Sequence, residues 1–364
     1  MLSLSPTARF VTLCTREPAA LQPGELRAAA AAVQDWDVLA TTGADHGVTG
    51  FVRQAVAREG IALPPRTERT LHATALVELA NVLRLNLELE RGVEALVSTG
   101  LPVIVLKGPA LARTIYPVAT LRPYTDIDLT VQERHEAAAA TLLASRYTEV
   151  PNGAEEARRA RASHLRDGAA FHRVFVTSDE GAAIELHTDP LQLGLRPTCE
   201  AGRWERAVPV PGLPGALMLG PEDQLVHLCV HAHKHGFSRL IWLKDIDLLL
   251  RTGGSGFDWD LAVDTARREG VQSSVWYGLR LASALLRTPA PRAQLERLHP
   301  GPLVRALYHL IWPVARIADL DGYMRRRGVQ FHAAESWRGT LPSLVLMGRR
   351  RTRARAMIQY LLRA

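Results

Sequence analysis

Two aspartates lie one residue apart in LRPYTDIDLTV, residues 121–131, a segment that otherwise has the composition of a buried strand. Because side chains alternate along a strand, Asp126 and Asp128 project from one face and their apolar neighbours from the other. Two like charges side by side repel, so a shared cation would explain the pair. Glu185, in AAIELHTD, alternates with apolar residues in the same way and offers a third carboxylate.

These three carboxylates have the chemistry of a magnesium site. Mg²⁺ prefers oxygen ligands and usually takes one or two carboxylates together with phosphate oxygens. Paired ions of this kind can clamp the attacking and leaving oxygens of a phosphoryl displacement. An Asp-x-Asp pair alone is weak support, because surface strands and loops often carry one, so the neighbouring segments decide.

The upstream segment LKGPAL adds features that suit a phosphate. It ends a β-branched run, residues 102–108, and opens a short helix, whose first N–H groups attract anions. Lys107 would add a point charge, and Gly108 would allow a triphosphate to approach closely. Arg122, four residues before Asp126, could bind a phosphate or form a salt bridge at the start of the strand.

The order of these motifs resembles a known family. LKG, LRPYTDIDLTV, a helix ending in Arg146-Tyr147, a strand with IELH, and a helix with HAHKH before WLKDIDLL follow one another along the chain. The series is similar to the bacterial uncharacterised nucleotidyltransferase family of the polymerase-β-type nucleotidyltransferase superfamily. The resemblance covers roughly residues 30–300.

The resemblance implies transfer of a nucleoside monophosphate, with AMP favoured, from an NTP, with ATP favoured, to a hydroxyl of a small molecule, peptide or protein. Pyrophosphate would be released, and the cofactor would be Mg²⁺ or Mn²⁺. By match to the motif, Asp126 and Asp128 would hold the ions and Glu185 would complete the site of the catalytic ion. Transfer of the γ-phosphate on the same metal site, and a non-catalytic NTP-binding or interaction module, remain as alternatives.

Two positions depart from the pattern of these relatives. The superfamily usually has Gly-Ser or Gly-Gly where this chain has Gly108-Pro109, and proline offers no N–H to a phosphate. Lys107 would then carry more of the phosphate binding. Thr188 stands where the family has an aromatic residue, which would reshape the base or acceptor pocket.

A row of histidines follows in HLCVHAHKH. His227, His231 and His235 are four residues apart and would form one line on a helix. The row could line the acceptor pocket, with His187 as a further member, or be partly buried at a domain seam. A zinc site is a third possibility, because histidines at this spacing recur in such sites.

A second Asp-x-Asp pair lies in WLKDIDLL. Asp245 and Asp247 fall in a helical pattern, in which residues two apart face different directions, so we do not expect a second metal pair. Lys244 and Asp245 are expected to form an ion pair at an interface in preference to a substrate contact.

Periodicity predicts an α+β fold: a small mixed β-sheet nucleotidyltransferase core flanked by N- and C-terminal helical regions. The expected division is 1–97 helical, 98–195 core and 196–364 helical. The core includes a hairpin with its turn at Ser178 to Gly181. A Pro/Gly-rich link, PVPGLPGALMLGPED, precedes the later helices.

Composition limits the remaining classes. The 364 residues are 47% hydrophobic and 22% charged, without an apolar run long enough to span a membrane and without a secretory signal, so we expect a cytoplasmic protein. Cys14, Cys199 and Cys229 lack metal spacing and are expected to be reduced, buried thiols. The net charge of +7 is concentrated near the C-terminus and could attract phosphates. Nucleic-acid binding there is a minority interpretation, since no RNA-binding motif is present.

Overall fold

The computed structural model describes residues 4–150, 172–179, 181–191 and 200–301. The basic C-terminal segment and Cys199 therefore lie outside the described residues. Cys14 and Cys229 are free and buried, as expected, and burial raises the pKa of both thiols. No helix within the described ranges is long and apolar enough to cross a membrane.

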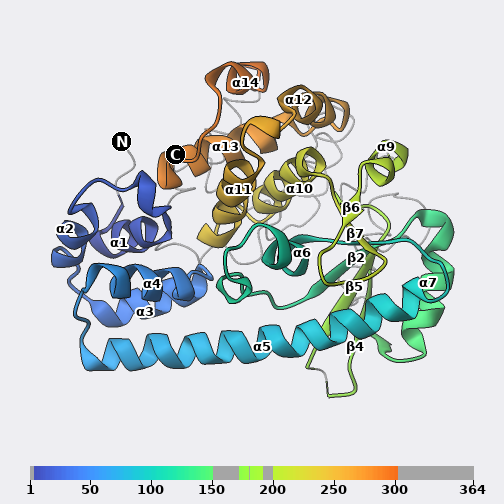
Figure 1. The fold of residues 1–364 in the computed structure, drawn as a ribbon, viewed down its shortest axis with the longest axis horizontal. Helices are drawn as coiled ribbons and strands as arrows, with labels where there is room; N and C mark the ends of the chain where they lie inside the picture. Colours follow the sequence, from blue (N-terminus) through green and yellow to red (C-terminus); the bar gives the residue numbers. More distant parts are fainter. Residues whose placement is uncertain (1–3, 151–171, 180, 192–199, 302–364) are drawn as a thin grey trace, which may run out of the picture.

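Most of the described helices form two groups, one that precedes the first strand along the chain and one that follows the last strand (Figure 1). The first group comprises α1 (Pro6–Thr15), α2 (Glu25–Ala31), α3 (Trp36–Asp45), α4 (Thr49–Glu59) and α5 (Pro65–Val97). Along the chain, α6 (Lys107–Thr114), α7 (Glu136–Ala144) and α9 (Glu200–Glu205) occur between strands of the sheet. The last group comprises α10 (Pro221–Lys234), α11 (Leu240–Gly253), α12 (Trp259–Arg268), α13 (Gln272–Leu286) and α14 (Arg292–Arg297). Short 3₁₀ turns lie at Pro18–Ala20, Ala119–Leu121, Glu133–His135 and Gly254–Gly256.

Local sequence explains where several helices begin and end. Ser5 caps α1 by accepting a hydrogen bond from the N–H of Ala8, and Asp35 caps α3 in the same manner. Gly60 ends α4 with a φ of +60°, in the left-handed region that glycine adopts without strain.

A mixed sheet of seven strands forms the centre of the fold, with the order β3-β4-β5-β2-β1-β7-β6. The strands are β1 (Val103–Val105), β2 (Ile127–Thr130), β3 (Thr148–Val150), β4 (Arg173–Val176), β5 (Ala183–His187), β6 (Val208–Pro209) and β7 (Ala216–Met218). β2 is parallel to β5 and antiparallel to β1, and β1 is parallel to β7. The α+β class and the arms of the β4–β5 hairpin are confirmed.

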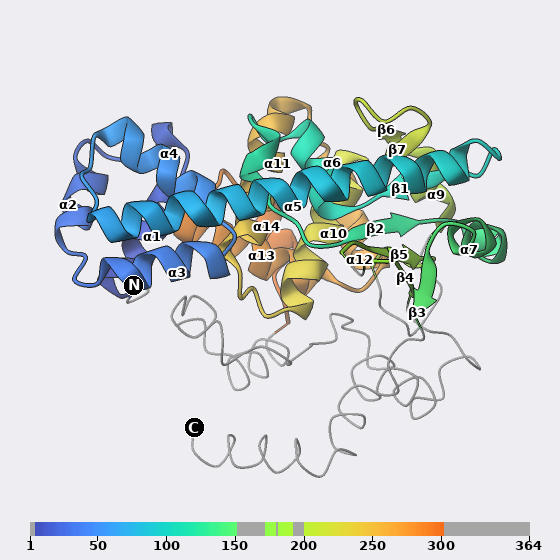
Figure 2. The same cartoon turned by 90° about the horizontal axis from the view of Figure 1, so that it is seen from below.

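The two faces of this sheet differ in character. One face packs its apolar side chains, among them Val105, Leu129 and Ile184, against α5 and α7 in a single cluster. The opposite face of β2 and β5 carries polar residues, because alternate residues of a strand point to opposite sides. Figures 1 and 2 show α5 extending from the N-terminal helices to the sheet.

The structure differs from the sequence analysis in the Pro/Gly-rich link, which contributes β6 and β7 to the sheet. Gly212 and Gly215, both with positive φ, make the turn between these two strands. β7 pairs with β1, which lies more than a hundred residues earlier, so local sequence could not announce the pairing. The sheet thus crosses residue 195, where the sequence analysis divides the core from the C-terminal region.

The C-terminal helices share a core with the N-terminal ones. Leu13 of α1, Val52 of α4, Leu243 of α11 and Leu285 of α13 belong to one buried cluster. Helices from the two ends of the chain therefore pack together on one side of the sheet domain (Figure 1).

Candidate functional site

Strands β2 and β5 bring the predicted carboxylates together. The two strands are parallel, with Asp128 beside Glu185 and Thr130 beside His187. Because neighbouring residues in register project from the same face, Asp128, Glu185 and His187 all point away from the apolar cluster. Asp128 and His187 are buried, whereas the Glu185 side chain keeps 25% of its surface exposed.

The side chains converge closely. One potential ligand atom from each of Asp128, Glu185 and His187 lies within 4.8 Å of the other two. The Nε2 of His187 is 2.9 Å from Oδ1 of Asp128 and 3.5 Å from Oε2 of Glu185. His172, on the residue before β4, adds an imidazole whose Nε2 is 3.8 Å from the same Glu185 oxygen.

Lys107 reaches this cluster from the adjacent strand. β1 ends at Val105 and α6 begins at Lys107, whose backbone has a φ of +51°. Its Nζ donates a hydrogen bond to Oδ1 of Asp128 at 2.7 Å. A left-handed conformation is uncommon for a residue with a side chain, and such residues concentrate at functional sites.

The charges in the cluster shift one another's pKa. Burial raises the pKa of Asp128, but the charges of Lys107 and His187 lower it by more, so the net direction is down. Burial and the Asp128 charge raise the pKa of Asp126 to about 6. Burial raises the pKa of Glu185, but the hydrogen bond from His187 outweighs this and the net direction is also down.

The same contacts raise the pKa of the two basic groups. Burial lowers the pKa of His187, but the carboxylates of Asp128 and Glu185 outweigh it and the pKa rises. Burial likewise lowers the pKa of Lys107, and Asp128 and Asp126 more than reverse this. Without a metal, the carboxylates of the cluster are therefore partly compensated by contacts with Lys107 and His187.

A divalent cation fits these residues. Oδ1 of Asp128 is used by Lys107 and His187, but Oδ2 is buried and has no hydrogen-bond partner among the described residues. A buried carboxylate oxygen without a partner is costly, and a cation would satisfy it. Asp128 and Glu185 offer the hard oxygen ligands that Mg²⁺ and Mn²⁺ take, and Mn²⁺ also accepts an imidazole nitrogen.

Asp126 and Gly108 each have a structural feature that the sequence did not indicate. Asp126 precedes β2 and acts electrostatically on Lys107, but its carboxylate is not in the group of three ligand atoms. Gly108 lies against Tyr124, and a Cβ on Gly108 would come within 2.6 Å of the Tyr124 Cβ. The glycine is therefore required by packing, independently of any phosphate.

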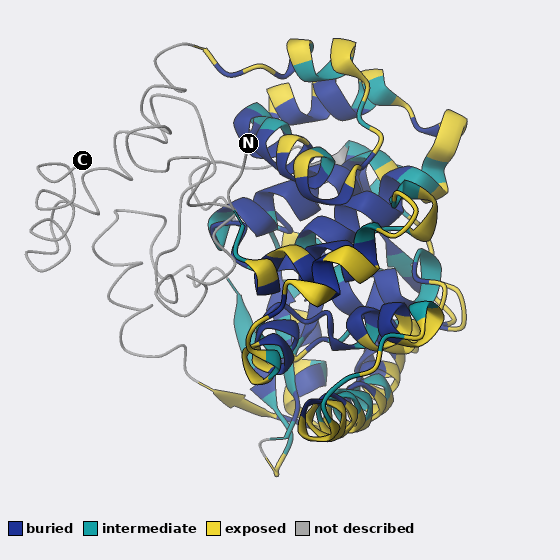
Figure 3. Cartoon of the chain, turned by 90° about the vertical axis from the view of Figure 1, so that its left-hand side faces the viewer, coloured by how far each residue is buried: buried dark blue, intermediate teal, exposed yellow. Residues whose placement is uncertain are grey.

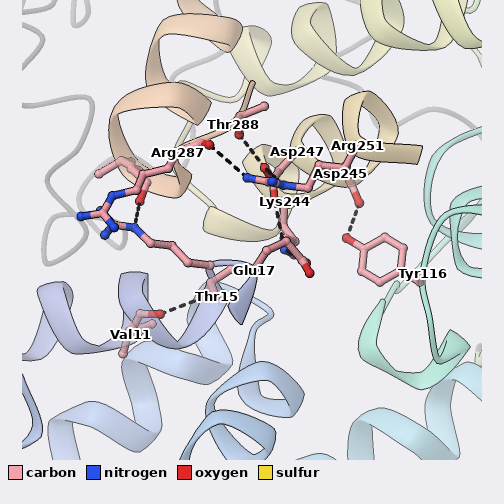
Figure 4. A network of polar contacts seen from close by, with 12 residues as sticks. Val11, Thr15, Glu17, Tyr116, Lys244, Asp245, Asp247, Arg251, Arg287 and Thr288 are labelled. Atoms are coloured by element: carbon pink, nitrogen blue, oxygen red, sulfur yellow. Dashed lines mark hydrogen bonds and ion pairs between the residues drawn. The ribbon is translucent and has the colours of Figure 1, made fainter. Parts of the chain in front are cut away.

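Of the two roles that the sequence allowed for Arg122, phosphate binding or a salt bridge, the structure shows the salt bridge. The partner of Arg122 is distant in the chain. Its Nε and Nη2 donate to the two carboxylate oxygens of Asp245 on α11, each at 2.7 Å. The hydroxyl of Tyr116 donates to the same carboxylate at 2.6 Å, as Figure 4 shows. These groups are buried, so Arg122 holds the segment before β2 against α11.

The expected ion pair between Lys244 and Asp245 is wrong. Lys244 donates to Asp247 at 3.0 Å and to Glu17 at 2.5 Å (Figure 4). Asp245 instead accepts hydrogen bonds from Arg122. A helix turns about 100° per residue, so neighbouring residues point away from one another. The expectation that Asp245 and Asp247 face apart is met for the same reason.

The histidine row lies on α10. The ring centroids of His227 and His231 are 6.5 Å apart, those of His231 and His235 are 4.7 Å apart, and Trp242 packs on the last two. Burial, followed by the Lys107 charge, lowers the pKa of His227 to about 3, and burial lowers the pKa of His235 to about 4. The electrostatic effect of Lys107 on these rings indicates that the row lies near the carboxylate cluster.

The zinc interpretation of this row finds no support in the part of the chain that the structure describes. There, the group of three converging ligand atoms is Asp128, Glu185 and His187, and the α10 histidines do not join it. Sequence reasoning placed His187 only in an acceptor pocket and missed it as a potential ligand. The signal was present, because His187 is two residues after Glu185 and shares its face of β5.

The parallel strands β2 and β5 present two carboxylates on the polar face of a small mixed sheet, and Lys107 at the start of α6 contacts one of them. These residue types suit phosphate chemistry assisted by a metal ion. The family model described as uncharacterised nucleotidyltransferase matches residues 32–287. The chain belongs to this family and is a nucleotidyltransferase. Neither the curated proteins nor the solved structures gave a match.

Proposed function

We propose that the protein transfers a nucleoside monophosphate from an NTP to a hydroxyl acceptor and releases pyrophosphate, with Mg²⁺ or Mn²⁺ at Asp128 and Glu185. The observation that carries this proposal is the buried Oδ2 of Asp128, which lacks a partner among the described residues and lies in a group of converging ligand atoms. A divalent cation bound there would neutralise the carboxylates and polarise the phosphate that is attacked. Asp126 contributes negative charge beside this group and serves as a further ligand in the proposal.

The protein's own residues would divide the remaining work. Lys107, at the start of α6, is the basic group closest to the carboxylates and would bind the phosphates next to the N–H groups of that helix. Arg122 is committed to Asp245, so the proposal does not use it for the nucleotide. His187 holds the carboxylates of Asp128 and Glu185 in place.

The acceptor would enter from the side of Glu185. This carboxylate is 25% exposed, whereas Asp128 is 1% exposed. As the acceptor oxygen bonds to the α-phosphorus and the bond to pyrophosphate breaks, the hydroxyl proton would pass to a carboxylate or to water. Both ring nitrogens of His227 are buried without a hydrogen-bond partner among the described residues, which supports the α10 row, with His231 and His235, as the acceptor pocket.

The acceptor class remains a small molecule, a peptide or a protein, and ATP is the nucleotide to test first. Transfer of the γ-phosphate would use the same metal ligands, and a non-catalytic NTP-binding module would keep them without turnover. The buried Oδ2 of Asp128, which has no partner among the described residues, supports a bound cation, since an uncompensated buried charge costs several kcal/mol.

The test uses ATP labelled at either the α- or the γ-phosphate, with the full chain, Mg²⁺ or Mn²⁺, and pools of candidate acceptors. Nucleotidyl transfer moves the α-label to the acceptor and releases pyrophosphate, and mass spectrometry identifies the modified acceptor. Movement of the γ-label with release of ADP would establish phosphoryl transfer instead. Tight nucleotide binding without either product, across all four NTPs, would contradict both transfers and favour the non-catalytic module.

A further inference from the structure

Helix α5 has two apolar sides, of which the fold covers one. Its inner side, including Leu85, Leu89 and Val93, is buried against the sheet. On the outer side Leu76 is 51% exposed, and Leu83 and Leu87 are each 56% exposed. Figure 3, which looks from the end at which α5 begins, shows exposed residues along this outer side.

The outer residues follow the spacing of a coiled-coil seam. Ala73, Leu76, Ala80, Leu83 and Leu87 are separated alternately by three and four residues, and all are exposed. This alternation keeps one stripe of a helix facing a partner helix over several turns. A continuous exposed stripe of this kind, in contrast to single exposed leucines, marks an interaction surface.

The charges at the two ends of the stripe indicate the partner. The same three-and-four spacing continues to Arg66 and Arg69 before the apolar residues and to Glu90 and Glu94 after them. Among the described residues, neither the Arg69 nor the Glu94 side chain has an ion-pair partner, whereas Arg66 lies 3.3 Å from Asp37. A helix that is basic at one end and acidic at the other is complementary to an antiparallel copy of itself.

We propose that two copies of this chain associate through antiparallel α5 helices. In the antiparallel register centred on the stripe, Leu76 packs against the partner's Leu87 and Ala80 against the partner's Leu83. Arg69 then lies beside the partner's Glu94 at both ends of the seam. Each contact occurs twice, as a two-fold axis requires.

The stripe is long enough for this association. Residues 69–94 extend over about 38 Å at 1.5 Å per residue, more than five helical turns. Arg84 follows Leu83 and therefore borders the stripe. It lies near the turn between β4 and β5, because its charge contributes to lowering the pKa of Asp179. The proposal rests on α5 alone and does not depend on the catalytic assignment.

The test measures the mass of the full chain by sedimentation velocity over a range of concentrations. We expect a dimer that dissociates on dilution. Leu83→Glu, at an exposed position that leaves the monomer core intact, should raise the dissociation constant at least about a hundredfold, because two apolar contacts are lost. Val208→Glu, at an exposed valine of β6, is the matched control and should leave the mass unchanged.

Charge reversal tests the antiparallel register. Arg69→Glu and Glu94→Arg should each weaken the homodimer by at least about tenfold, because each places like charges together at both ends. The double variant should restore it, and an equimolar mixture of the two single variants should form heterodimers. A monomer at all concentrations, or a dimer that Leu83→Glu leaves unchanged, would overturn the proposal, and so would a double variant as weak as the singles.

Discussion

The tetrapeptide Asp-Ile-Asp-Leu occurs twice in this chain, at residues 126–129 and 245–248, with different results. In the first copy Asp128 lies on β2 beside Glu185, and Asp126, just before the strand, adds its charge to the same cluster. In the second copy, on helix α11, Asp245 contacts Tyr116, and Asp247 contacts Lys244, Arg251 and Thr288 (Figure 4). Asp245 also accepts hydrogen bonds from Arg122. Identical residues thus serve a shared site in one place and two separate ion-pair networks in the other.

The difference also lies in how the charges are compensated. Both carboxylate oxygens of Asp245 are bonded by Arg122, and both of Asp247 have basic or hydroxyl partners. Oδ2 of Asp128 has no partner among the described residues. The carboxylate oxygens of the helical copy are all bonded by other residues of the protein, whereas in the strand copy Oδ2 of Asp128 is available to an external ligand.

The largest expected effect comes from breaking the strand copy. Asp128→Asn removes the charge of a proposed metal ligand without changing the side-chain shape, and we expect pyrophosphate release to fall by about a thousandfold. Mn²⁺ affinity, measured by electron paramagnetic resonance, should fall in parallel and requires no acceptor. Glu149→Gln, at a carboxylate that binds Arg173 at the edge of the sheet, is the matched control. Unchanged metal affinity in Asp128→Asn would remove Asp128 from the site.

Breaking the helical copy should affect stability. Asp245→Ala leaves the buried guanidinium of Arg122 without its carboxylate, and we expect the free energy of unfolding to fall by about 3–5 kcal/mol. The measurement is equilibrium denaturation in urea. The double variant Arg122→Met/Asp245→Leu should recover most of the loss, because a buried charge is no longer unpaired.

Equal losses of stability in the Asp245→Ala variant and the double variant would contradict this account.

Asp247→Ala should lower the free energy of unfolding by less, about 2–3 kcal/mol, since Lys244 keeps Glu17 as a partner.

The smallest expected effect comes from His233 on α10. This helix packs on α11 and also carries His227, which is within electrostatic range of Asp128. Burial lowers the pKa of His233 to about 4, from 6.5 in the unfolded chain. Because the unfolded state takes up the proton first, stability is full above pH 6.5 and falls as the pH drops toward 4. We expect His233 to account for a loss of about 2 kcal/mol between pH 7 and pH 5.

Thermal unfolding across this pH range tests the role of His233, with His233→Gln as the variant. The glutamine can still bond the Ser274 hydroxyl that the histidine contacts at 2.7 Å. The slope of stability against pH should become shallower in the variant. An unchanged slope would assign the acid sensitivity to other groups.

Several features were accessible from the sequence because they depend on local periodicity. Alternation along β2 and β5 was enough to predict that Asp128 and Glu185 share the polar face, and helical spacing was enough to separate Asp245 from Asp247. The family match over residues 32–287 supports the nucleotidyltransferase assignment that the ordered motifs suggested.

Other features depend on which distant segments pack together, and only the tertiary structure decided them. Arg122 could have met a phosphate or a carboxylate, and the packing of α11 beside α6 supplied Asp245, 123 residues later. β7 joined the sheet because β1 offered a free edge, although its own sequence is a Pro/Gly-rich link. Local sequence determines which face of an element a side chain occupies, but its partner is determined by long-range packing, whose free energy is shared among many residues along the chain.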